Sequence, residues 1–145
     1  MSSRAAPSHV VVQPAHFPAA RGYANGIVTR GRTLYVAGQV GWELDGTFAT
    51  DDLADQFARA LDHVIDIVRA AGGSPEHIVQ MRVYVTDLPA YRNSLKRIGV
   101  LWRERLGRHF PVMALVGVNG LVEPRAKVEI EAVAALPDPG EGAGE

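Results

Sequence analysis

The stretch Val128-Glu129-Ile130-Glu131-Ala132-Val133-Ala134, near the C-terminus, decides the fold class. The apolar residues at 128, 130, 132 and 134 alternate with Glu129, Glu131 and Val133, which is the period of two that a β-strand with one buried face shows. Both carboxylates therefore point away from the core. On pattern alone, the strand is either a charged edge strand that resists sheet-to-sheet association or the wall of a site where a carboxylate activates water.

Other segments upstream also have the character of strands. Branched apolar residues and two-residue alternation predict strands over residues 10–12, 22–28, 33–40, 78–86, 112–118 and 127–135. A turn at residues 29–32 suggests that 22–28 and 33–40 form a hairpin. A second turn, through Gly120 and Pro124, is expected to join the last two strands.

Two segments carry apolar residues at helical spacing. Residues 50–71 place one apolar stripe against a charged face, with Thr50 or Asp51 as the expected N-cap and Gly72-Gly73 as the stop. A second helix is expected to be capped by Asp87 and to run to Gly107, with Pro89 in its first turn.

This order of elements predicts an α+β fold in a single domain, in which two helices pack on one face of a mixed sheet. Residues 9–136 form the expected domain, and residues 1–8 and 137–145 are expected to be disordered tails because they contain little apolar surface. No helix is left to cover the second face of the sheet. We therefore expect the protein to associate with further copies of itself.

Composition excludes several classes of function. Fifteen basic and sixteen acidic residues give a formal charge of -1, so no electrostatic footprint for nucleic acid is present. The absence of cysteine rules out disulfides, a thiolate nucleophile and sulfur-ligated zinc. The five histidines lie at no ligand spacing, and neither a signal peptide nor a membrane segment is visible. We expect a cytoplasmic protein with no metal site, no nucleic-acid partner and no membrane partner.

Several segments, taken together and in order, resemble one known family. They are Gly22-Tyr23-Ala24-Asn25, Leu34-Tyr35-Val36-Ala37-Gly38-Gln39, Met81-Arg82-Val83-Tyr84-Val85-Thr86-Asp87, Phe110-Pro111 and Val128-Glu129-Ile130-Glu131-Ala132. This set resembles the RidA/YjgF family, also labelled endoribonuclease L-PSP. The resemblance runs from about residue 23 to residue 135, and the Val-Glu-Ile-Glu-Ala strand is among its most specific parts.

The resemblance implies a chorismate mutase-like fold and a homotrimer whose sheets form a central barrel, with ligand clefts between subunits. In the family's deaminases these clefts hydrolyse 2-imino or enamino acids without metal or cofactor. By position, Glu129 would activate water as the catalytic residue. The expected substrate-binding residues are Tyr23, Gln39, Tyr84, Met113, Ala114 and Leu115.

One position departs from the family pattern. The deaminases carry an arginine two residues after the proline of the Phe-Pro segment, where it binds the substrate carboxylate, and this chain has Met113 there. A thioether makes only soft apolar contacts, whereas arginine forms a bidentate charged pair. Ala37 also replaces the family's usual serine. Arg21 or Arg125 is a possible substitute cation.

The sequence therefore leaves two main functions open. The first is a RidA-like hydrolase that deaminates a small imine, enamine or related metabolite. The second is a non-catalytic trimer that binds a small molecule or a protein partner. Ribonuclease activity, which only the family label suggests, fits the nearly neutral charge poorly.

Overall fold

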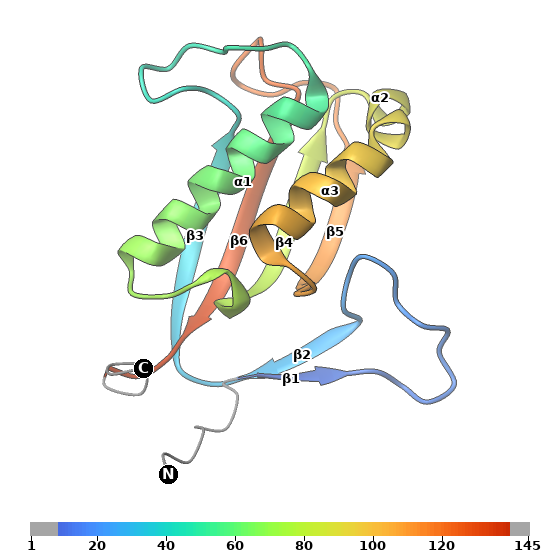
Figure 1. Cartoon of the computed structure of the whole chain (residues 1–145), viewed down its shortest axis with the longest axis vertical. Coiled ribbons are helices and arrows are strands. Elements are labelled where there is room, and N and C mark those ends of the chain that lie inside the picture. Colours follow the sequence, from blue (N-terminus) through green and yellow to red (C-terminus); the bar gives the residue numbers. More distant parts are fainter. Residues whose placement is uncertain (1–8, 140–145) are drawn as a thin grey trace.

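The computed structural model of the chain describes residues 9–139, drawn in colour in Figure 1. The strands are β1 (His9–Val12), β2 (Gly26–Thr29), β3 (Arg32–Val40), β4 (Ile78–Val85), β5 (Val112–Gly117) and β6 (Val128–Leu136), and the helices are α1 (Leu53–Ala70), α2 (Leu88–Asn93), α3 (Leu95–Leu106) and a short 3₁₀ turn at Pro75–His77. Residues 1–8 and 140–145, which include most of the expected tails, lie outside the described residues.

Four strands form the main sheet in the order β3-β6-β4-β5. β6 pairs antiparallel with β3 on one side and with β4 on the other, while β4 and β5 run parallel. The sheet is therefore mixed, as the sequence predicted. β6, the strand with the two glutamates, lies in the interior of the sheet and is not an edge strand.

Helices α1 and α3 pack side by side across one face of this sheet (Figure 1). The core lies between them and the strands. Its strand members are buried and include Met81, Val83, Val128 and Ile130, which are the residues that the alternation of β4 and β6 assigned to the covered face. The opposite face, with Glu129 and Glu131, is left uncovered by any described element of the chain (Figure 1).

The predicted hairpin between residues 22–28 and 33–40 is wrong. β2 pairs with β1 in a separate two-stranded sheet, with Val12 opposite Gly26, and β3 pairs with β6. Gly31 adopts a positive φ of 107°, and a Cβ there would lie 2.3 Å from the carbonyl oxygen of Leu136. The chain at Gly31 is thus packed on the end of β6 and passes from one sheet into the other instead of folding back.

The helices also differ from expectation at their ends. α1 begins at Leu53, and its N-cap is Asp52, not Thr50 or Asp51; the Asp52 carboxylate accepts a hydrogen bond from Asp55 N at 2.9 Å. Thr50 instead accepts from Asp52 N at 3.0 Å. The expected stop is confirmed, since Gly72 has φ 90° and Gly73 N donates to Val68 O.

The second predicted helix is two helices, α2 and α3. They meet at Ser94, which has φ -100° and ψ 0° and donates a hydrogen bond from its hydroxyl to Ala90 O at 2.8 Å. A serine hydroxyl that binds a nearby backbone carbonyl competes with regular helical bonding. Within residues 9–139, no helix is both long and apolar enough to cross a membrane.

Candidate functional site

Glu129 projects from β6 onto the uncovered face of the sheet. Its neighbours across the sheet are Val40 on β3 and Tyr84 on β4. The side chain is half-buried, and within residues 9–139 the structure shows no hydrogen bond or ion pair to its carboxylate. A carboxylate that is partly shielded from water and has no partner in the described part of its chain is available to a ligand or to a water molecule.

The space for this carboxylate is provided by Gly38. A Cβ at Gly38 would lie 2.5 Å from Glu129 Oε1 and 2.9 Å from its Cδ. Gly38 falls where the register of β3 against β6 shifts, between Val36 and Gln39. Such an irregularity bends a strand locally and redirects its side chains. The bulge and the missing side chain together let the Glu129 carboxylate lie against the backbone of β3.

The second glutamate, Glu131, is engaged by its neighbours on the same face. The hydroxyl of Tyr84 donates to Glu131 Oε1 at 2.5 Å, and Arg82 lies 3.7 Å from the same oxygen. The hydrogen bond to the carboxylate raises the pKa of Tyr84 above its ordinary value. The two carboxylates therefore differ: Glu131 is held in a small network with Tyr84 and Arg82, and Glu129 is free.

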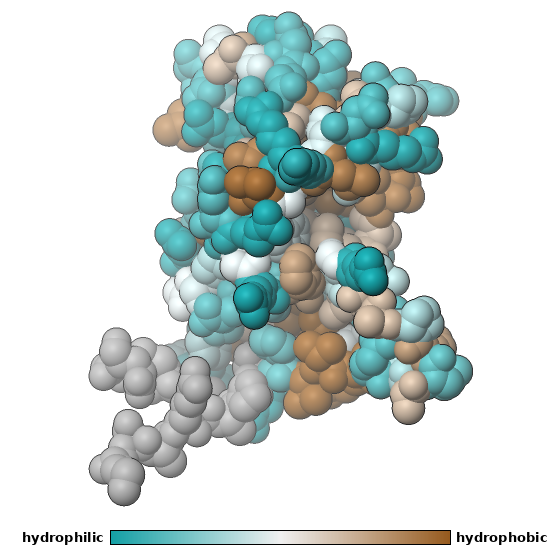
Figure 2. Space-filling model, turned by 45° about the vertical axis from the view of Figure 1, so that its right-hand side comes forward, coloured by the Kyte–Doolittle hydropathy of each residue, from teal (hydrophilic) through white to brown (hydrophobic). Residues whose placement is uncertain are grey.

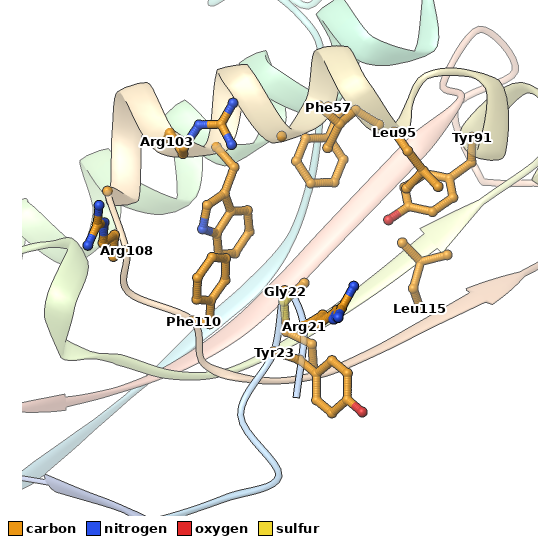
Figure 3. Close-up of a pocket in the computed structure, with 15 residues that line it drawn as sticks. Arg21, Gly22, Tyr23, Phe57, Tyr91, Leu95, Arg103, Arg108, Phe110 and Leu115 are labelled. Carbon is orange, nitrogen blue, oxygen red and sulfur yellow. The ribbon is translucent and has the colours of Figure 1, made fainter. Parts of the chain in front are cut away.

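A pocket of about 500 Å³ lies on the other side of the sheet, where β5 forms the edge. Met113 and Leu115 face it from β5, because they pair with Met81 and Val83 of the covered face. α3 forms another wall, and residues 21–23 approach from the N-terminal loop (Figure 3). This loop is fixed beside β5 by a hydrogen bond from Ala24 N to Pro111 O at 3.0 Å.

Aromatic side chains form much of the apolar lining of the pocket. The rings of Trp102 and Phe110 are stacked, with centroids 5.9 Å apart and an interplanar angle of 5°. Trp102 is further fixed by a hydrogen bond from its indole nitrogen to His109 O at 3.1 Å. Burial raises the pKa of Tyr91, another lining residue, above its usual value. The pocket is thus a preformed apolar cavity.

The predicted site residues fall into two groups in a single chain. Glu129, Tyr84 and Ala114 lie on the uncovered face, since Ala114 pairs with Arg82 of that face. Tyr23, Met113 and Leu115 line the pocket at the β5 edge. Gln39 lies opposite Ile130 and donates from its amide to Ala37 O at 3.1 Å. The sheet separates Glu129 from Met113 within one copy of the protein.

The two candidate replacement cations have different surroundings. Arg125 bonds to Asp51 at 2.9 Å and to Phe48 O at 3.2 Å, and its guanidinium lies 5.7 Å from the centroid of the Phe48 ring. The hydrogen bond from the Arg125 guanidinium to the Asp51 carboxylate holds the pKa of Asp51 below its usual value. Arg21, in contrast, lines the same pocket as Met113. Of the two, only Arg21 lies beside the family's arginine position.

Sequence reasoning missed part of this pocket. Gly99, Arg103 and Arg108 also line it. The only signal for them in the sequence is faint: a glycine and an arginine beside the apolar stripe of the second predicted helix. Within residues 9–139, no three His, Asp or Glu side chains gather as a metal ion would require.

These features define a class: small α+β proteins with two helices on one face of a mixed sheet, an uncovered second face with acidic residues and an apolar pocket at the sheet edge. The sequence profile of the family described as Endoribonuclease L-PSP matches residues 14–136. The chain belongs to this family, which contains the RidA and YjgF proteins. The resemblance inferred from its motifs is confirmed.

Individual relatives agree with this assignment. The human 2-iminobutanoate/2-iminopropanoate deaminase is 28% identical over 125 residues, which is 86% of this chain and 88% of the relative. A Rid-family protein of unknown function from Yersinia pestis has a TM-score of 0.78 at 28% identity, over 90% of this chain and all of that one. A YjgF-family structure from Mycobacterium tuberculosis has a TM-score of 0.60 at 31% identity, over 89% of this chain and all of that one.

Proposed function

We propose that this protein hydrolyses a small imine, enamine or related reactive metabolite, with Glu129 as the catalytic residue. The single observation that carries the proposal is the Glu129 carboxylate, which is half-buried, has no hydrogen-bond or ion-pair partner among residues 9–139, and lies in the space left by Gly38. Relatives named as imine deaminases support the same reaction class at the level of the family.

The reaction needs only a positioned water and a group that moves protons. Glu129 accepts a proton from water as the oxygen attacks the imine carbon, and it then passes this proton to the imine nitrogen, which restores the carboxylate. The resulting carbinolamine then breaks its C–N bond as the nitrogen takes a second proton and the hydroxyl loses one. Imine and water become a carbonyl compound and ammonia, so atoms and charges balance. General acid–base catalysis of this kind contributes about 10²- to 10⁴-fold in rate.

The separation of Glu129 from Met113 supports a site made by more than one copy. In one chain they lie on opposite faces of the sheet, so a cleft that uses both requires Glu129 from one copy and the β5 edge from another. We propose a homotrimer in which the uncovered faces form a central barrel. Tyr35 and Val116, apolar side chains that are 78% and 45% exposed on this face, would become buried there.

Met113 sets the expected preference among substrates. A thioether cannot form the bidentate charged pair by which arginine binds a carboxylate. We therefore expect the protein to act on imines whose recognition depends less on a carboxylate at this position. Tyr23 and Met113 line the same pocket, and in the proposed cleft the Tyr23 ring and the Met113 thioether would provide an apolar wall.

Ammonia release from freshly generated 2-iminopropionate and from a panel of imines without a carboxylate tests this function. Wild type should accelerate hydrolysis of at least one member of the panel, and Glu129→Gln should lower that rate by about 10²-fold or more. Met113→Arg should raise the rate on 2-iminopropionate by about 10-fold or more, because the new guanidinium can pair with the carboxylate.

Glu131→Gln is the matched control, since it changes the other carboxylate of the same strand without touching the proposed proton transfer. It should retain most of the activity. Wild type and Met113→Arg both failing to release ammonia above the uncatalysed rate, across the whole panel, would contradict the proposal.

One observation favours a second function. The pocket at Met113 has an interior lined by stacked aromatic rings and other apolar side chains, which suits a non-catalytic trimer that binds a small molecule or a partner. In that case Met113→Arg would change binding of the small molecule, and no variant would release ammonia. Ribonuclease activity has less support, because the chain carries a formal charge of -1.

A further inference from the structure

One polar side chain of α1, that of Gln56, is completely buried, with an exposed fraction of 0%. No other amide, hydroxyl or charged side chain within residues 9–139 is buried to this extent. The hydrophilic side chains that Figure 2 shows lie, in contrast, at the surface of the molecule. A buried amide costs free energy unless its polar atoms are hydrogen-bonded. The partners of the Gln56 amide therefore indicate which parts of the fold this side chain holds together.

These partners are backbone groups of two loops. The Gln56 side-chain nitrogen donates to Thr50 O at 2.9 Å and to Arg125 O at 3.1 Å, and the side-chain oxygen accepts from Lys127 N at 2.8 Å. Thr50 lies between β3 and α1, whereas Arg125 and Lys127 lie just before β6. A single side chain thus joins the start of α1 to the chain that enters β6.

The backbone at Lys127 is held from two sides. Its N–H donates to Gln56, and its carbonyl accepts from Thr86 N, just after β4, at 3.1 Å. Glu129 follows two residues later, and in a strand residues two apart point to the same face. A shift of the backbone at Lys127 would therefore be carried along β6 to Glu129.

The backbone of Gln56 also contacts the end of β3. Glu129 lies opposite Val40 in the β3–β6 pairing, and Gly41 follows Val40 directly. A Cβ at Gly41 would lie 2.7 Å from Gln56 Cα, so the two backbones are packed against each other. Gln56 therefore contacts β3 through its backbone and the entrance to β6 through its side chain. These are the two strands between which the Glu129 carboxylate lies, beside Gly38.

We propose that Gln56 is a positioning residue for Glu129, because its hydrogen bonds set the place of β6 relative to β3 and so keep the carboxylate in the space left by Gly38. The inference rests on the proposed function, since it concerns the group that moves protons in that reaction. Gln56 itself touches no reacting atom. Its loss should slow the reaction through Glu129 alone, because a small misplacement of a catalytic group costs a large factor in rate.

The kinetic constants of Gln56→Leu test this role. On the most reactive imine of the panel, with rates expressed per folded molecule, kcat should fall by about 10-fold or more and KM should change by less than about 3-fold. Gln56→Glu should fold and keep a kcat above that of Gln56→Leu, because a protonated carboxyl retains an oxygen that accepts from Lys127 N and one O–H that donates.

Leu61→Ala is the matched control for a loss of stability. Leu61 is a fully buried residue of the same helix, and its truncation removes apolar contacts without touching the Gln56 bonds. Its midpoint in urea should fall, but its kcat per folded molecule should stay within about 2-fold of wild type. An equal loss of kcat in Leu61→Ala and Gln56→Leu would show that stability alone explains the effect.

A double-mutant cycle shows whether Gln56 acts through Glu129. When Gln56→Leu is added to Glu129→Gln, the residual rate should fall by less than about 2-fold, because the group that Gln56 positions is already absent. The same 10-fold loss in both backgrounds would overturn the inference.

Hydrogen exchange gives a readout that needs no activity. In Gln56→Leu the amides of residues 128–130 should exchange faster than in wild type, whereas Leu61→Ala should not single out this segment. Faster exchange at residue 127 alone, where the bond is removed, would contradict the inference. If wild type releases no ammonia, the proposed function fails, and exchange at residues 128–130 then decides by itself whether Gln56 holds the backbone of Glu129.

Discussion

At the level of single residues, Gly38 determines where the Glu129 carboxylate lies. Gly38→Ala would place a Cβ 2.5 Å from Glu129 Oε1, and the flexible end of the glutamate must then move. The stability of the fold should change by less than about 1 kcal/mol, because alanine fits an extended backbone and also reduces unfolded-state entropy. Ammonia release should fall by about 10-fold or more, since catalysis depends on the placement of the proton-transferring group.

Gly26→Ala is the control for this prediction. Its new Cβ would lie 3.5 Å from Val12 Cβ, which is an ordinary contact, so both urea unfolding and ammonia release should match wild type. If Gly38→Ala retains full activity, the position of Glu129 against β3 has no role in the reaction.

At the level of elements, Gln56 connects α1 to the chain that enters β6. Its side chain is fully buried; the amide donates to Thr50 O at 2.9 Å and to Arg125 O at 3.1 Å, and its oxygen accepts from Lys127 N at 2.8 Å. Gln56→Leu would leave these three partly buried backbone groups without their Gln56 partners. The free energy of unfolding should fall by about 2–4 kcal/mol, and urea denaturation should show this loss as a lower midpoint concentration.

Gln80→Leu is the matched control for Gln56→Leu, because Gln80 is half-buried and no hydrogen bond from its side chain appears in the described part of the chain. Gln80→Leu should change the free energy of unfolding by no more than about 0.5 kcal/mol. Equal losses in the two variants would mean that the Gln56 bonds do not stabilise the junction before β6.

The contrast between strands shows which features of an element can be predicted. The alternation of β6 correctly placed Glu129 and Glu131 away from the helices, because a period of two fixes the face of every side chain. It did not reveal the partners of β2 and β3, since pairing depends on where a strand end docks, here Gly31 against Leu136. The break between α2 and α3 occurs at Ser94, where the serine hydroxyl donates to Ala90 O and so competes with regular helical bonding. The spacing of apolar residues along a helix does not predict such a break.

At the level of the whole molecule, the two parts of the candidate site come from opposite faces of one sheet. Periodicity could predict that Glu129 faces the open side, but the pocket arises when the loop carrying Tyr23 docks on β5 through Ala24 and Pro111. Such long-range docking leaves no periodic trace in the sequence. Whether the parts meet depends on assembly, which is where the remaining prediction belongs.

Tyr35 is the side chain on which association through the uncovered face can be tested most directly. It lies on β3 opposite Val133 and is 78% exposed in a single chain. In the proposed trimer, Tyr35→Glu would bury an unpaired carboxylate, at a cost of several kcal/mol. Sedimentation velocity should show the wild type at three times the 15.6 kDa chain mass and Tyr35→Glu mainly at the monomer mass, with ammonia release lost in parallel. Leu44→Glu, at a loop residue that is 97% exposed, should remain trimeric. A wild-type protein that sediments as a monomer and still releases ammonia would show that one chain alone contains the whole site, so that Glu129 acts without the β5 edge of a neighbour.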